Sequence, residues 1–169
     1  VRKKIGKRTI FNMIGPLSSP ALVKKQVVGV FDKKLLGIFA NALKGLEITN
    51  AWIVNSEDGL DEISPYAITN VCQLKNGDIS NILIDPAELR IKTKGFDDIL
   101  GRHAEYNSQK IIEVFKGEDN DFSIAVCLNA AAGLIVSGNK NDFKDAYQET
   151  RDHILSGKTF DHLKKIQNA

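Results

Sequence analysis

Cysteine and histidine are both scarce in this sequence. Its two cysteines, Cys72 and Cys127, lie far apart, form no C-x-x-C pair and stand in apolar stretches that suit a core. This usage argues against a disulfide framework and favours a reducing compartment, so we expect a cytoplasmic protein. The histidines show no ligand spacing with one another or with the cysteines, which argues against a zinc site. They are His103, His153 and His162.

Long hydrophobic runs and several catalytic signatures are also missing. The longest apolar run, residues 124–136, is shorter than a membrane span and carries Asn129 in its middle, so we expect no membrane crossing. The sequence has no G-x-S-x-G elbow, no P-loop and no G-x-G-x-x-G fingerprint. With 169 residues and 43% hydrophobic content, the chain suits one domain with a real core.

Charge is distributed unevenly along the chain. Residues 1–34 hold nine Lys or Arg and one Asp, a net charge of +8, whereas the remainder holds 14 basic and 20 acidic residues, a net charge of −6. A basic opening fits nucleic-acid binding, or one wall of an anion site whose other wall lies elsewhere. The sequence starts at Val1 with no methionine and no signal-peptide apolar region, so we expect that preceding residues have been removed.

Hydrophobic periodicity predicts an α/β fold. Residues 26–31 form a β-branched run of strand length, and residues 51–54 form a second apolar run. Between them, residues 33–46 place apolar side chains at the spacing of one helix face. A strand, helix, strand unit with near-continuous apolar strands is typical of a parallel sheet covered on both faces.

Later segments add a hairpin and helices. Asn76 and Gly77 separate two apolar-rich runs, which predicts that residues 69–85 are antiparallel or lie at a sheet edge. Asp121 and Asp142 stand where helix starts prefer a carboxylate or a cap. We therefore expect a mostly parallel sheet with flanking helices and one antiparallel hairpin or edge.

The stretch NSEDGLDEISP crowds four carboxylates into six positions around a glycine. They are Glu57, Asp58, Asp61 and Glu62. Like charges this close repel each other, so a cationic partner would relieve the cost. Magnesium fits, because it prefers hard oxygen ligands and usually takes one or two protein carboxylates. Spacing alone favours a simpler interpretation, a solvated turn whose acids cap a following helix.

Four blocks of the sequence carry a resemblance to a known family. They read VRKKIGKRTIFNMIGPLSSPA, SEDGLDEISP, GRHAEYNSQKII and LNAAAGLIVSG. In order and spacing they resemble the carboxyl-terminal part of the anthranilate phosphoribosyltransferases of the tryptophan pathway. The resemblance implies an α/β domain of the nucleoside phosphorylase and phosphoribosyltransferase type, incomplete at its amino-terminal side. It also implies an enzyme that joins anthranilate to the ribose of phosphoribosyl pyrophosphate and releases pyrophosphate.

The resemblance also implies roles for individual residues. Asp61 and Glu62 correspond to the pair that holds Mg²⁺ near the pyrophosphate, which reverses the preference for a solvated turn. Arg2 corresponds to an arginine that contacts anthranilate, and a guanidinium fork suits a carboxylate. Gly15 and Pro16 correspond to a pair that lines the anthranilate tunnel, although as sequence punctuation they end a helix.

Two positions depart from the family and two asparagines need an explanation. Ser19 and Tyr106 stand where the family more often has asparagine and glutamate. Asn107 and Asn129 lie in predicted helices, where asparagine is a mediocre former. We expect both to be buried amides that hydrogen-bond across a tight contact.

The family's glycine-rich phosphate loop and amino-terminal helical domain have no counterpart in residues 1–169. The resemblance therefore implies that this chain alone is inactive or nearly so, and that the full-length enzyme is a homodimer. Two alternatives stay open, a nucleoside phosphorylase-like enzyme and a noncatalytic nucleic-acid binder. GLDEIS and RTIFN speak against the first, and the acidic pair speaks against the second. We expect anthranilate and phosphoribosyl pyrophosphate as partners, with no nucleic acid and no membrane.

Overall fold

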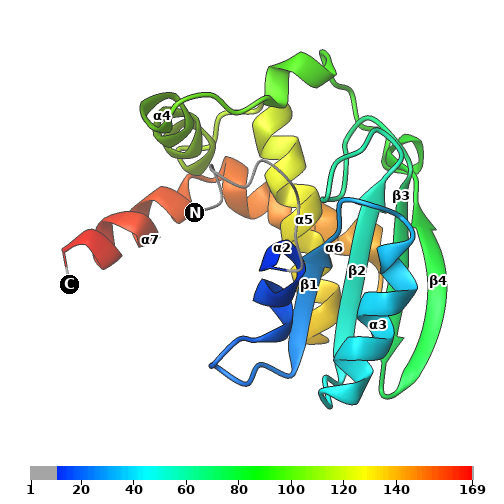
Figure 1. Ribbon diagram of the computed structural model, residues 1–169. Helices are drawn as coiled ribbons and strands as arrows, with labels where there is room; N and C mark the ends of the chain where they lie inside the picture. The colour runs from blue at the N-terminus through cyan, green and yellow to red at the C-terminus, as the bar shows by residue number, and fades with distance from the viewer. Residues whose placement is uncertain (1–10, 169) are drawn as a thin grey trace.

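The computed structural model describes residues 11–168, which form a sheet with helices on both faces (Figure 1). The strands are β1 (Lys25–Gly29), β2 (Asn50–Ser56), β3 (Thr69–Lys75) and β4 (Asp78–Ile84). The α-helices are α2 (Phe11–Ile14), α3 (Leu35–Gly45), α4 (Ala104–Phe115), α5 (Asp121–Ser137), α6 (Phe143–Leu155) and α7 (Lys158–Gln167). The 3-10 helices are η1 (Gly15–Leu17), η2 (Pro86–Leu89) and η3 (Phe96–Ile99).

The sheet has the order β1-β2-β3-β4 and is mixed. β1 pairs with β2 in parallel through the α3 crossover, as the strand, helix, strand pattern predicts. β2 pairs with β3, and β3 with β4, in antiparallel fashion. The α/β class is confirmed, but parallel pairing within residues 11–168 is limited to β1 and β2. The reason is that a loop without a helix joins β2 to β3, and parallel neighbours need a crossover.

The hairpin between β3 and β4 is confirmed at its predicted turn. Lys75 pairs with Asp78, so Asn76 and Gly77 are the two loop residues. Both have positive φ, 51° at Asn76 and 88° at Gly77, as a type I′ turn requires. Asn-Gly adopts this turn readily because asparagine tolerates the left-handed region and glycine enters it without a steric penalty.

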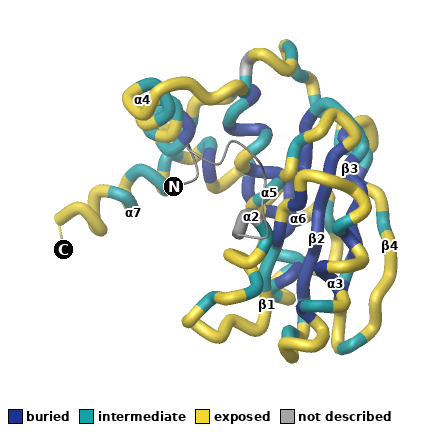
Figure 2. Tube along the Cα trace, in the orientation of Figure 1, coloured by how far each residue is buried: buried dark blue, intermediate teal, exposed yellow. Residues whose placement is uncertain are grey.

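The two faces of the sheet are covered by different helices (Figures 1 and 2). On one face, α3 packs Leu36, Phe39 and Leu43 against side chains of β2 and β3 such as Ile53 and Leu74. On the other face, α5 and α6 cover the remaining strand side chains. The buried members of that cluster include Trp52, Val54, Val71, Cys127, Leu128, Ala131 and Tyr147. Because alternate residues of β2 point to opposite faces, this strand contributes to both clusters and is buried along nearly its whole length.

Helix starts follow local capping chemistry. The predicted start at Asp142 is confirmed, since its side chain caps α6 by accepting a hydrogen bond from the Asp145 N–H. At α5 the cap lies one residue earlier than Asp121, because Asn120 and Ser123 form a reciprocal capping box. Asp121 is the first helical residue and is 4% exposed. Because Asn120 makes the cap, the carboxylate of Asp121 can accept hydrogen bonds from other segments. None of the helices in residues 11–168 has the length and apolar character that spanning a bilayer requires.

Candidate functional site

The acidic loop, residues 57–68, leaves the carboxyl end of β2 and returns as β3. Its base is closed by two backbone hydrogen bonds. The Ser56 N–H donates to Leu60 O at 2.9 Å, and the Glu57 N–H donates to Ile68 O at 2.9 Å. Because these bonds attach the base of the loop to the strand ends, the acidic residues lie at the end of the sheet where β1 and β2 both finish.

The four carboxylates of the loop divide into structural and unpaired groups. Asp58 maintains the loop, because its Oδ1 accepts from the Leu60 N–H at 3.2 Å and its Oδ2 accepts from the Ser64 hydroxyl. Glu57, Asp61 and Glu62 are exposed, and none has a side-chain hydrogen bond or salt bridge within residues 11–168. The loop is followed directly by β3 and not by a helix, so the interpretation that its acids cap a following helix is wrong.

Asp61 and Glu62 line a cavity of about 610 Å³. Its walls come from β1, β2, the acidic loop and α5. The lining includes Val27, Gly29, Val54, Ile63, Phe122, Ala125 and Asn129. This position, outside the carboxyl ends of parallel strands, is where open α/β sheets commonly bind ligands. Glu57 does not line the cavity, which separates it from Asp61 and Glu62.

Gly29 brings the backbone of the acidic loop against β1. A Cβ atom at this position would lie 1.6 Å from Asp61 O and 2.7 Å from the Asp61 carbonyl carbon. No side chain fits into that space, so the close approach requires glycine. The site therefore depends on the last residue of β1, which the sequence pattern marked only as part of a strand.

Asn129, in the middle of α5, holds the acidic loop from the other side. Its Oδ1 accepts from the Ile63 N–H at 3.0 Å, and its Nδ2 donates to Ile63 O at 3.2 Å and to Ala125 O at 3.0 Å. The prediction that Asn129 bonds across a tight contact is confirmed, although the residue is half-buried and not fully buried as expected. Asn107 makes the same pair of bonds to the backbone of Arg102, at 2.8 and 3.3 Å, but these bonds are exposed and Asn107 is half-buried, not fully buried as expected.

Asp121 joins the acidic loop to the segment before η3. One carboxylate oxygen, Oδ2, accepts from the Tyr66 hydroxyl at 2.8 Å, from the Lys94 N–H at 2.8 Å and from the Gly95 N–H at 3.3 Å. The capping position of Asp121 signalled only a helix start. Its role in tying two loops to α5 depends on partners that are distant in sequence, so sequence reasoning missed it.

The electrostatics of the cavity favour a cation. Although Glu62 is exposed as a residue, neighbouring atoms partly desolvate its carboxyl, which raises its pKa above the ordinary value, and the negative charge of Asp61 beside it raises the pKa further. Both causes disfavour a negative charge on Glu62 beside the charge of Asp61. No group of three or more His, Cys, Asp or Glu side chains suited to a metal ion occurs within residues 11–168. A two-carboxylate site fits Mg²⁺ when phosphate oxygens and waters complete the octahedron.

Gly15 and Pro16, which the resemblance also implies, do not line this cavity. Gly15 and Pro16 begin η1 and are exposed. Pro16 lines a separate cavity of about 100 Å³, together with residues of α3 and the segment before β1. Arg2 lies outside the described residues. The anthranilate-binding roles of Arg2, Gly15 and Pro16 therefore stay predictions.

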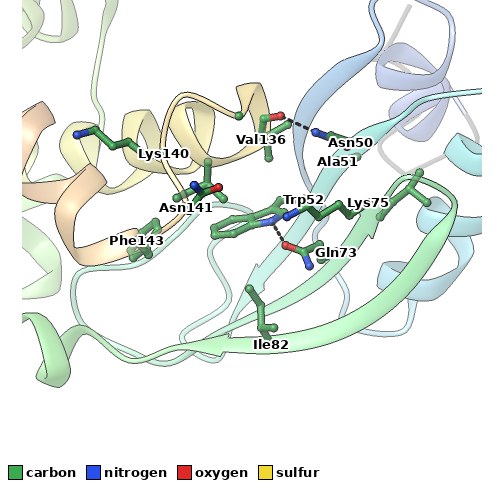
Figure 3. A pocket seen from close by; sticks show the side chains of 13 residues that line it. Asn50, Ala51, Trp52, Gln73, Lys75, Ile82, Val136, Lys140, Asn141 and Phe143 are labelled. Carbon is green, nitrogen blue, oxygen red and sulfur yellow. Dashed lines mark hydrogen bonds between the residues drawn. The ribbon is translucent and has the colours of Figure 1, made fainter.

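A second cavity, of about 300 Å³, lies at the opposite end of the sheet and is shown in Figure 3. Trp52 forms its centre, with its ring centroid 5.7 Å from that of Phe143 and its Nε1–H donating to Gln73 Oε1 at 2.9 Å. Asn50 donates to Val136 O at 3.2 Å, and Lys140 forms a salt bridge with Glu149. No carboxylate from residues 11–168 lines this cavity.

The parallel pair joined by α3 and the acidic loop over its carboxyl end define an α/β protein with a site for a polar or charged ligand. The chain belongs to the glycosyl transferase family, because the model described as "Glycosyl transferase family, a/b domain" matches residues 1–160.

Similar proteins give a narrower picture. Over 168 residues the chain is 70% identical to the anthranilate phosphoribosyltransferase of Pelagibacter ubique (strain HTCC1062), covering 99% of this chain and 51% of that protein. It is 36% identical over 164 residues to the enzyme of the same name from Aquifex aeolicus (strain VF5), covering 97% and 48%. The crystal structure of the Thermus thermophilus anthranilate phosphoribosyltransferase matches with a TM-score of 0.86 and 28% identity, covering 97% and 48%.

These matches confirm the resemblance drawn from the four sequence blocks. They also show that the chain spans about half the length of the curated relatives it matches.

Proposed function

We propose that this chain supplies the carboxyl-terminal part, residues 1–169, of the α/β domain of an anthranilate phosphoribosyltransferase. Such an enzyme transfers the phosphoribosyl group of phosphoribosyl pyrophosphate to the amine of anthranilate, releases pyrophosphate and serves tryptophan biosynthesis. The observation that carries the proposal is the pair Asp61 and Glu62, which line a cavity at the carboxyl end of the parallel strands without a partner among the described residues. The 70% identity to a protein of that name supports it.

Asp61 and Glu62 would hold Mg²⁺ in the proposed site. The raised pKa of Glu62 supports this role, because a dication beside the pair offsets the repulsion that disfavours its charged form. When bound, the ion supplies positive charge that stabilises the departing pyrophosphate. The Saccharomyces cerevisiae enzyme, which has a TM-score of 0.84 to this chain, was solved in complex with PRPP and Mg. Gly29 and Asn129 would fix the backbone of the acidic loop that carries these two carboxylates.

Anthranilate binding is the second part of the proposal. Arg2 would meet the anthranilate carboxylate with two hydrogen bonds. Gly15 and Pro16 would form part of the wall along which the ring enters. The Saccharomyces cerevisiae enzyme was also solved in complex with 4-fluoroanthranilate, which supports this substrate class for the fold.

The proposed whole enzyme is longer than this chain. The half-length coverage of the relatives supports the expectation that residues 1–169 alone turn over substrate slowly or not at all. We propose that the complete protein is a cytoplasmic homodimer. A turnover assay on the 169-residue chain checks the first point, and a rate typical of an ordinary enzyme would contradict it.

Calorimetric titration of this chain with phosphoribosyl pyrophosphate and Mg²⁺ tests the proposed site. The expected result is Mg²⁺-dependent binding that is lost when Asp61→Asn and Glu62→Gln are combined. The charge-matched control combines Glu57→Gln with Glu88→Gln, which removes two carboxylates outside the cavity and should leave binding unchanged. Equal binding by the Asp61 and Glu62 double variant and by the wild-type chain would overturn the assignment of the pair.

A further inference from the structure

We propose that Asn129 is a positioning residue for the metal-binding pair, because its amide fixes the backbone beside Glu62. The metal part of this inference rests on the function proposed above. The positional part rests on the geometry alone, and the experiment below separates the two.

The contact reaches the residue that directly follows Glu62. Asn129 Oδ1 accepts from the Ile63 N–H, and Asn129 Nδ2 donates to Ile63 O. These two bonds hold the peptide groups on both sides of Ile63, and the first of these groups is the link to Glu62. The Ile63 side chain is 1% exposed, so core packing restrains the same residue. The third bond of Asn129, to Ala125 O, fixes the amide to its own helix.

A second contact restrains the backbone on the other side of Asp61 and Glu62. The Asp61 carbonyl rests against Gly29, where a Cβ would lie 1.6 Å from Asp61 O. The backbone is thus held against β1 at residue 61 and against α5 at residue 63. Asp61 lies at the first contact and Glu62 lies between the two, so we expect the loss of either contact to change the distance between the two carboxylates. Losing a group that orients a metal ligand typically weakens metal binding by about 10- to 100-fold, and Asn129 would orient the ligands through the backbone.

A purely stabilising role for Asn129 is the alternative, and Asn107 allows the two to be separated. Asn107 makes the same two bonds to the backbone of one residue, Arg102, but it lies on α4 and does not line the cavity of Asp61 and Glu62. If Asn129 acts only through fold stability, Asn129→Ala and Asn107→Ala will have the same effect on metal binding per folded molecule. If Asn129 positions the pair, only Asn129→Ala will weaken it.

The experiment uses the ¹³C- and ¹⁵N-labelled 169-residue chain with Mn²⁺ as the probe. Paramagnetic broadening of the amide signals of residues 60–63 is followed as Mn²⁺ is added to the wild-type chain, Asn129→Ala and Asn107→Ala. We expect an apparent affinity about 10-fold or more weaker in Asn129→Ala and unchanged in Asn107→Ala. Unchanged affinity in Asn129→Ala, or an equal loss in both variants, would overturn the positioning role. If Asn129→Ala does not fold, Asn129→Ser replaces it, because serine is too short to make both bonds to Ile63.

A second readout needs no metal. Hydrogen exchange at the Ile63 N–H and the ¹³C shift of the Glu62 carboxyl are measured in the same three proteins. We expect faster exchange and a shifted signal in Asn129→Ala, and neither change in Asn107→Ala. If the wild-type chain binds no Mn²⁺, the metal part of this inference fails while these two signals still decide whether Asn129 positions the loop. Unaltered signals in Asn129→Ala would refute that role.

Discussion

The two ends of the sheet show two ways of building a cavity. At the carboxyl end of β1 and β2, the acidic loop is held through its backbone, by the close approach at Gly29 and the amide of Asn129. At the opposite end, the cavity is formed by side-chain packing around Trp52, whose polar group is already bonded to Gln73. Holding a loop by its backbone leaves side chains available for a ligand. Function is therefore expected at the first end and stability at the second.

The largest expected effect is the loss of packing at the Trp52 end. Trp52 is 3% exposed and contacts Phe143, so Trp52→Ala leaves a cavity and should lower the free energy of unfolding by about 3–5 kcal/mol. Urea unfolding measures this loss. Mn²⁺ broadening of residues 60–63 in the folded population should stay the same, and a large loss of metal affinity would break the division between the two ends.

A smaller loss of stability, with a specific loss of function, is expected at Gly29. In Gly29→Ala the new Cβ meets the Asp61 carbonyl, so the loop must move at a cost of about 1–3 kcal/mol. Urea unfolding and Mn²⁺ broadening measure both effects, and metal affinity should fall. Gly37→Ala is the matched control, because nothing lies within 4 Å of a Cβ there and alanine favours the α3 helix by about 1 kcal/mol. A metal affinity of Gly29→Ala equal to that of the control would contradict the role of Gly29.

Asp121→Ala should cost about 1–2 kcal/mol, because the Tyr66 hydroxyl and two backbone N–H groups lose one shared acceptor. Amide exchange at Lys94 and Gly95 should become faster, which hydrogen-exchange NMR detects. The comparison variant is Asp142→Ala, which removes the α6 cap and should cost about 1 kcal/mol without affecting either loop. Slow exchange at both amides in Asp121→Ala would mean that other contacts order this segment.

The smallest expected effect is a pH dependence from Glu62. Its pKa is raised in the folded chain, so the folded state holds this proton more tightly than the unfolded state does. The resulting stability is present below the ordinary glutamate pKa of about 4.3 and is lost as pH rises through the folded pKa. Glu62→Gln should therefore show a smaller fall in the urea midpoint between acidic and neutral pH than the wild-type chain. An equal change in Glu57→Gln would assign the effect to the general charge of the loop.

Local signals were sufficient for much of the fold. The β1-α3-β2 unit and the hairpin at Asn76 and Gly77 follow from periodicity and turn chemistry, which act within a few residues. The extent of parallel pairing did not follow, since it depends on whether the chain crosses the sheet through a helix after β2. The segment that contains η2 and η3 has no periodicity that the sequence could reveal.

The candidate site was predictable in its chemistry but not in its support. The carboxylates of Asp61 and Glu62 are visible as a charge cluster, and the family resemblance implies that they hold Mg²⁺. Asn129 bonds to Ile63, which is 66 residues away in the sequence, and Asp121 bonds to Tyr66, which is 55 residues away. Such pairs depend on how the layers pack, so one sequence shows that a polar residue needs a partner without identifying the partner.

The outermost strands have a practical consequence for anyone handling this chain. Among residues 11–168, β1 and β4 each pair with only one neighbour, and β4 also carries Leu83 at 66% exposure. Unpaired strand edges act as templates for the strands of other molecules. Aggregation should therefore be set by protein concentration more than by unfolding. Leu83→Lys would place a charge on the exposed face of β4, and we expect it to extend the concentration range over which the chain stays monomeric.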